Sequence, residues 1–146
     1  MKNIKYDIAI VEDNPNDAEL MVRTLKKGNV TKNMIILEDG EQALNFIFCK
    51  KQFADRDPSK QPKVLFLDLK LPKVNGLEVL EQMKANDETK KIPIIIMTSS
   101  KENSDIKKAY KLGVNSYIVK PVEFNKYTDV INNVGSYWLN VNEYHQ

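Results

Sequence analysis

The sequence predicts a single α/β domain in which a doubly wound, parallel sheet of five strands is covered by five helices. Short apolar runs alternate with amphipathic segments along the chain. Four of the five runs are continuously apolar, which is typical of strands buried on both faces of a parallel sheet. The length of 146 residues suits one domain, so we expect residues 1–146 to form a single unit.

The five apolar runs are the expected strands, and the strict alternation with helices favours the common strand order 2-1-3-4-5. The runs are Tyr6–Val11, Met34–Leu37, Val64–Leu67, Ile92–Met97 and Tyr117–Val119. The segments between them carry helical spacing. Capping signals agree with this division, because Asn14-Pro15 precedes the first helix and Gly28 follows it.

The last helix is expected to be long, reaching about residue 143. Its apolar residues recur at gaps of three and four: Phe124, Tyr127, Ile131, Val134, Trp138 and Val141. We expect the stripe from Phe124 to Val134 to pack on the sheet. The residues that follow, Tyr137, Trp138 and Val141, suit contact with a partner or a second copy as well as packing on their own chain.

Composition excludes several classes of function. The net charge of +2, with both signs mixed along the chain, does not favour nucleic-acid or membrane binding. No apolar stretch reaches the ~18 residues of a membrane span, and the start has no signal-peptide core, so a cytoplasmic protein is expected. Cys49 has no disulfide partner and is expected to be buried in a helix, and the charged stretch 50–63 is typical of a solvated loop.

Carboxylates gather at the ends of two predicted strands. Glu12 and Asp13 follow the first strand, and Asp68 follows the third, which lies beside it in the expected order. Ligands of doubly wound sheets bind outside the carboxyl ends of the strands. Like charges there require a cation or raised pKa values, and Mg²⁺ prefers such oxygen ligands. The sequence therefore predicts a divalent metal site at this edge.

Two further side chains stand at the ends of the fourth and fifth strands, at the same edge. Lys120 ends the fifth strand and supplies a positive charge, and Thr98 ends the fourth and supplies a hydroxyl. A carboxylate nucleophile, a metal ion, a lysine and a hydroxyl are together suited to attack a phosphoryl group and to stabilise its oxygens. The set therefore indicates phosphoryl transfer.

Four motifs in order resemble those of two-component response-regulator receiver domains, which share the flavodoxin-like strand order. They are residues 11–14 (VEDN), 66–76 (FLDLKLPKVNG), 96–100 (IMTSS) and 117–121 (YIVKP). The resemblance covers essentially the whole chain. The loop at 53–63 and the closing residues 137–139 resemble single-domain regulators paired with phytochrome-type and related sensor histidine kinases.

The resemblance implies that Asp68 accepts a phosphoryl group from the phosphohistidine of a sensor histidine kinase of the phytochrome type or of a hybrid kinase. Mg²⁺ or Mn²⁺ would be held by Asp13, Asp68 and the backbone carbonyl of Lys70, with Glu12 acting through water. Lys120 would pair with Asp68 and then with a phosphoryl oxygen. The protein would be a stand-alone signalling protein that assists its own phosphorylation and dephosphorylation, and not an enzyme acting on a released substrate.

The resemblance also implies a switch. Thr98 would move toward the phosphoryl group, and Tyr117 would turn into the vacated space and change the surface of the fourth helix, fifth strand and fifth helix. A homodimer could form through that surface and the C-terminal tail. Lys70 and Ser100 stand where the family tunes the lifetime of the phosphoryl group. Lys120-Pro121 would be a cis peptide.

Two other classes of protein fit less well. A haloacid-dehalogenase-like phosphatase also forms an aspartyl phosphate, but it needs a second aspartate two residues after the nucleophile, where this sequence has Lys70. A flavin-binding module would need a phosphate-binding loop after the first strand, and the acidic residues there would repel phosphate.

Overall fold

The computed structural model describes residues 4–28 and 33–143. Five parallel strands form one sheet in the order β2-β1-β3-β4-β5, which confirms the predicted fold class and order. The strands are β1 (Ile8–Val11), β2 (Met34–Leu37), β3 (Val64–Leu67), β4 (Ile94–Thr98) and β5 (Ser116–Val119). The register aligns Val11 with Leu67 and Thr98 with Val119, so the strands end together at one edge.

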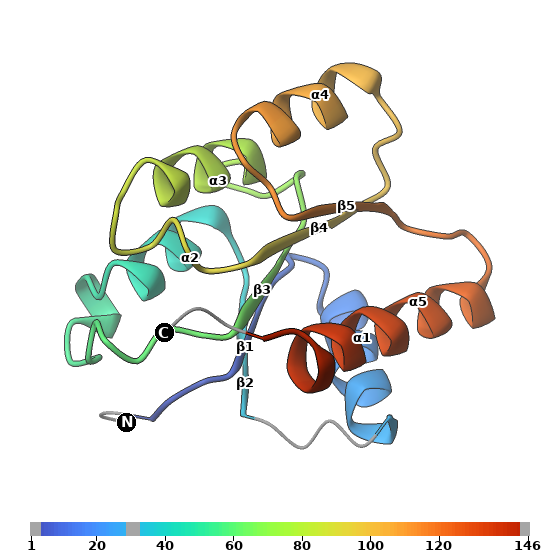
Figure 1. Cartoon of the computed structure of the whole chain (residues 1–146), viewed down its shortest axis with the longest axis horizontal. Coiled ribbons are helices and arrows are strands. Elements are labelled where there is room, and N and C mark those ends of the chain that lie inside the picture. The colour runs from blue at the N-terminus through green and yellow to red at the C-terminus, as the bar shows by residue number, and fades with distance from the viewer. Residues whose placement is uncertain (1–3, 29–32, 144–146) are drawn as a thin grey trace.

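Helices cover both faces of the sheet (Figure 1). They are α1 (Pro15–Lys27), α2 (Gly40–Ile47), α3 (Gly76–Lys84), α4 (Asn103–Lys111) and α5 (Phe124–Ser136). Helices α1 and α5 lie side by side on one face, and α2, α3 and α4 lie on the other. This is the doubly wound, three-layer arrangement that the alternation of elements predicts.

The central strands have no polar face, because each side chain meets one of two cores. On β1, Ile8 and Ile10 pack with α1 and α5, while Ala9 and Val11 pack with α2 and α3. All four residues of this strand are at most 1% exposed. Burial on both faces explains the continuous apolar runs. Within the described residues, no helix is both long and apolar enough to cross a bilayer.

The C-terminal helix differs from the prediction in its last turns. Regular α-helix ends at Ser136, and a π-helical segment η2 (Tyr137–Val141) continues it, so helical structure reaches Val141, near the predicted end at about residue 143. Phe124 was expected to pack on the sheet but is 61% exposed, because it stands at the first position of α5, beyond the edge of the sheet. Leu139 is buried and Trp138 packs partly against its own chain, whereas Tyr137 and Val141 are exposed.

The loop after α2 is exposed or partly exposed at most of its charged residues, as predicted for a solvated loop, but it has one buried charged residue, Arg56. It contains a 3₁₀ turn, η1 (Lys51–Phe53), and Arg56, which is only 8% exposed and lies 3.7 Å above the Phe46 ring. The Arg56 guanidinium donates to the carbonyls of Phe46 and Lys60. Cys49 lies just past α2 in a left-handed conformation with φ of 55° and is partly exposed, so its predicted place inside the helix is wrong.

Candidate functional site

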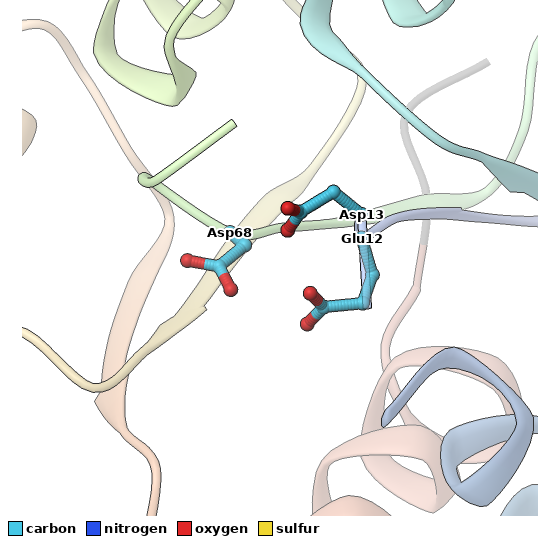
Figure 2. A group of neighbouring side chains, drawn as sticks. All are labelled: Glu12, Asp13 and Asp68. Carbon is cyan, nitrogen blue, oxygen red and sulfur yellow. The ribbon is translucent and has the colours of Figure 1, made fainter. Parts of the chain in front are cut away.

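Three carboxylates converge at the edge where β1 and β3 end (Figure 2). Glu12 and Asp13 follow β1, and Asp68 follows β3; one carboxylate oxygen of each lies within 4.8 Å of the others. The backbone fixes this geometry, because the amide of Glu12 donates to the Leu37 carbonyl and that of Asp68 to the Val11 carbonyl. The carboxylates that the sequence assigned to one site therefore do meet.

Lys120 reaches this cluster from the end of β5. Its ammonium donates to Glu12 Oε1 at 2.7 Å and to Asp68 Oδ2 at 3.0 Å. Asp17, in the first turn of α1, adds a third carboxylate oxygen at 3.6 Å. Burial alone would lower the pKa of Lys120, but the hydrogen bonds to Glu12 and Asp68 raise it above its usual value. The lysine is therefore a fixed positive charge within the acidic site.

Glu12 is the most buried of the acidic residues, with 4% of its surface exposed. Burial raises its pKa to about 7, against the lowering effect of the Lys120 ammonium, and Asp68 adds to the rise. A single lysine therefore does not neutralise the three carboxylates. The site has an excess of hard oxygen donors, which is the donor set that a small divalent cation prefers.

The predicted cis peptide before Pro121 is not found: the Lys120–Pro121 bond is trans, the isomer that X–Pro bonds favour by about 0.5–1 kcal/mol. The Lys120 amide donates to the Thr98 carbonyl at 2.7 Å, which extends the pairing of β5 with β4 by one residue. From this position the Lys120 side chain reaches the acidic cluster with a trans peptide bond.

The loop between β3 and α3 closes over Asp68. The amide of Lys70 donates to Asp68 Oδ1 at 3.2 Å, and the amide of Gly76 donates to the Leu69 carbonyl at 2.8 Å. A Cβ on Gly76 would lie 2.3 Å from the Asp68 carbonyl oxygen, so only glycine allows this approach. Asn75 accepts from the amide of Glu78 and caps α3.

The hydroxyl and aromatic residues of the predicted switch lie next to this cluster. Thr98 is fully buried and its Oγ1 accepts from the amide of Ser100 at 3.4 Å. The Tyr117 hydroxyl donates to the Ser100 carbonyl at 3.0 Å, and the ring packs partly on the core beneath α3 and α4. Tyr117 therefore points inward.

The model of the response regulator receiver domain family matches residues 8–132 of this chain. The chain belongs to this family. Receivers similar to it over nearly their full length include the response regulator Rcp1 of Synechocystis sp., which is 34% identical over 90% of this chain and 88% of its own length. The chain is therefore a phosphoacceptor signalling protein of the two-component type, and its family is not that of the haloacid-dehalogenase-like phosphatases.

Solved receiver structures support the same assignment. The Mn²⁺-bound form of Rcp1 superposes with a TM-score of 0.89 at 31% identity, covering 95% of this chain and 98% of that one. The phosphorylated cyanobacterial phytochrome response regulator RcpA also gives 0.89, at 28% identity over 98% and 100%. The bacteriophytochrome response regulator AtBRR is 43% identical, with a TM-score of 0.73, over 93% and 96%.

Two polar residues of the receiver site were missed by the sequence interpretation. Asp17 contacts Lys120, and its place in the first turn of the helix that directly follows Glu12 and Asp13 was an available signal. Asp105 in α4 accepts from the Ser100 hydroxyl at 2.6 Å. No local pattern marked Asp105, because a single acidic residue in the first turn of an amphipathic helix is ordinary.

Proposed function

We propose that Asp68 is the residue that accepts the phosphoryl group. One observation carries the proposal: the Asp68 carboxylate lies between a lysine ammonium at 3.0 Å and two further carboxylates. An Asp68 oxygen attacks phosphorus and forms an O–P bond as the P–N bond to the imidazole of the donor histidine breaks, and the imidazole leaves with the electron pair. Lys120 then pairs with an oxygen of the transferred group.

The residues present fit a divalent cation, and we propose Mg²⁺ or Mn²⁺. The proposed ligands are Asp13, Asp68 and the backbone carbonyl of Lys70, with Glu12 acting through a water molecule. When bound, the ion offsets the negative charge that the carboxylates and the phosphoryl oxygens bring together. The 4.8 Å clustering of three carboxylates and the Mn²⁺-bound form of the similar Rcp1 support this proposal.

The output of the site is a change of surface rather than a released product. The Thr98 hydroxyl donates a hydrogen bond to a phosphoryl oxygen on Asp68. The loop that joins β4 to α4 passes this change to the side chain of Tyr117, which turns in response. Lys70 and Ser100 flank the acceptor, and we propose that they set the lifetime of the phosphoryl group. Local charge then biases a two-state packing arrangement.

Receiver domains take their phosphoryl group from sensor histidine kinases, and we propose a phytochrome-type or hybrid kinase as the donor here. The similarity to RcpA and AtBRR supports that choice. The donor of such a system acts in the cytoplasm, so we propose the same location for this chain. The exposed side chains of Tyr110, Tyr137 and Val141 support a homodimer through α4, β5, α5 and the C-terminal segment.

Intact-mass spectrometry after incubation with acetyl phosphate and Mg²⁺ tests the proposal. We expect wild type to gain an acid-labile adduct of about 80 Da, the mass of one phosphoryl group. Asp68→Asn should gain none, and the matched control Asp129→Asn, an exposed residue of α5, should behave as wild type. An unmodified wild type, or an equal adduct on Asp68→Asn, contradicts the assignment.

A further inference from the structure

Every polar group of Ser100 is engaged, and the partners come from four different positions around it. Its amide donates to Thr98 Oγ1 at 3.4 Å, and its carbonyl accepts from the Tyr117 hydroxyl at 3.0 Å. Its own hydroxyl donates to Asp105 Oδ2 at 2.6 Å and accepts from the amide of Glu102 at 3.3 Å. Through these hydrogen bonds Ser100 connects Thr98, at the end of β4, to Tyr117 and to α4.

The contact with Asp105 is the shortest of the four. A hydroxyl that donates to a carboxylate at this distance makes a charge-assisted hydrogen bond, about twice as strong as a neutral one. Ser100 is only 7% exposed, so the bond is shielded from water. Because residues 99–102 form no regular structure, this bond and the Glu102 amide fix the loop against the first turn of α4.

When Ser100 is held in place, so is its carbonyl oxygen, which accepts the hydrogen bond from the Tyr117 hydroxyl. The Tyr117 hydroxyl is bound to the carbonyl of the same residue whose hydroxyl Asp105 holds. If the loop moved outward, the aromatic ring would lose that acceptor and gain access to solvent. Burial raises the pKa of Tyr117, with the Asp105 carboxylate adding to the rise, which places that hydroxyl in the field of Asp105.

The same geometry leaves Thr98 ready for a phosphoryl oxygen. Its hydroxyl oxygen accepts from Ser100, so its proton remains available for donation toward Asp68. A loop held in this position therefore suits the phosphorylated site as well as the inward Tyr117. By linkage, whatever stabilises the inward arrangement also favours the modified acceptor.

We propose that Asp105 is a positioning residue of the switch: by holding Ser100 it keeps Tyr117 inward and so favours occupation of Asp68 by a phosphoryl group. The proposal rests on the proposed function of Asp68. It predicts that, in the metal-loaded protein without a phosphoryl group, the Tyr117 side chain points inward in most molecules.

Fluorine NMR of protein labelled with 3-fluorotyrosine reads the position of Tyr117 directly, with Tyr117→Phe assigning its resonance among the six tyrosines. We expect the Tyr117 signal of Asp105→Ala, without any phosphoryl group, to move toward the solvent-exposed value and to show a larger H₂O/D₂O shift than wild type. Glu102→Ala is the matched control, because it removes a carboxylate at the start of the same helix that makes no side-chain capping bond.

A titration with beryllofluoride in excess Mg²⁺ measures the coupling to the acceptor. We expect Asp105→Ala to weaken apparent affinity by roughly five- to tenfold, which is part of the value of one charge-assisted hydrogen bond, and Glu102→Ala by less than about twofold. Asp105→Asn, which keeps a neutral acceptor oxygen, should lie between them. Ser100→Ala should give the same loss, and the double variant Ser100→Ala/Asp105→Ala should lose no more than either alone.

The outcomes separate the two proposals. If wild type and every variant fail to bind beryllofluoride, the proposed function fails, and the Tyr117 resonance of the free protein still decides the role of Asp105. A Tyr117 resonance in Asp105→Ala that matches wild type overturns the inference. So does a loss of affinity that Glu102→Ala shares. If Asp105→Ala does not fold, Ser100→Ala removes the same bond from its other end and decides the question.

Discussion

The ammonium of Lys120 donates to the buried carboxylate of Glu12 at 2.7 Å, although their strands β5 and β1 are not neighbours in the sheet. The contact to Asp68 is longer, at 3.0 Å. The lysine thus compensates the charge of Glu12 as well as that of Asp68, the proposed acceptor. Its charge supports the fold of the site in addition to any part in the transfer.

Replacing Lys120 by methionine should therefore destabilise the metal-free protein. We expect Lys120→Met to lower the free energy of unfolding by roughly 3 kcal/mol near pH 8, because a buried carboxylate loses its partner. Urea denaturation followed by circular dichroism measures the change. Lys126→Met, which removes the same charge from the exposed start of α5, should cost less than about 0.5 kcal/mol. Equal losses in the two variants would contradict a structural role for the pair.

The raised pKa of Glu12 predicts how stability depends on pH. Its value in the folded protein is about 7, above the 4.5 of the free side chain, so folding favours the protonated form. The corresponding contribution to stability is complete below about pH 4.5 and is lost as the pH rises through 7. Metal ions compete with that proton. We expect the stabilisation by Mg²⁺ to grow between about pH 5.5 and pH 8.

Thermal melts with a chelator and with excess Mg²⁺ at both pH values check this dependence. In Glu12→Gln the side chain cannot titrate, so the stability of the metal-free form should change much less over the same interval. Stabilisation by Mg²⁺ that is independent of pH in wild type would contradict the displacement of a proton from this residue.

The strand order and the gathering of Glu12, Asp13 and Asp68 could be predicted because both follow from local rules. A strand buried on both faces is continuously apolar, and parallel strands that end at one edge bring their next residues together. Lys120 and Thr98 followed from the same rule, and the structure places them at that edge. The parallel register of the strands therefore explains why most of the site residues could be predicted to lie together.

What could not be predicted depends on contacts between distant segments. Arg56 stands in a charged stretch, and only the fold shows that Phe46 and the nearby carbonyls bury it. The hydrogen bond of Asp105 to Ser100 depends on how α4 is placed relative to the end of β4. The trans bond before Pro121 depends on the path of β5, which sequence resemblance does not fix.

Gly76 offers a test of how closely the loop must approach the acceptor. A Cβ there would lie 2.3 Å from the Asp68 carbonyl oxygen and 2.6 Å from Leu69 Cα, so relief of the clash would shift the backbone at Asp68, the proposed acceptor. We expect Gly76→Ala to cost roughly 2–3 kcal/mol of stability and to slow phosphorylation by acetyl phosphate. Urea titration and the rate of adduct formation measure the two effects.

Gly135→Ala is the matched control for that variant. Its Cβ would also meet an atom at 2.3 Å, but this atom is Leu25 Cδ2, the end of a side chain that can rotate. Alanine is also the better helix former, by about 1 kcal/mol. We therefore expect a small net change in stability and a normal phosphorylation rate. A normal rate in Gly76→Ala as well would show that the approach of α3 does not position Asp68.

The chain has two arginines, and the structure predicts that replacing one of them costs little stability and replacing the other costs much. Arg23 forms an i,i+4 pair with Glu19 at 3.4 Å, and both side chains are about two-thirds exposed, so Arg23→Met should change stability by less than about 0.5 kcal/mol. Arg56 is buried and donates to the carbonyls of Phe46 and Lys60. Arg56→Met leaves those acceptors unsatisfied and should cost roughly 2–4 kcal/mol.

Arg56→Lys should not restore the loss, because one ammonium cannot reproduce the planar guanidinium that stacks on Phe46 while donating to two separated carbonyls. Limited proteolysis should cut Arg56→Met and Arg56→Lys within residues 50–63 faster than wild type. Adduct formation on Asp68 should persist in both, since this loop lies away from the carboxyl ends of the strands. Full stability in Arg56→Lys would mean that positive charge alone holds the loop, and that the guanidinium geometry contributes nothing.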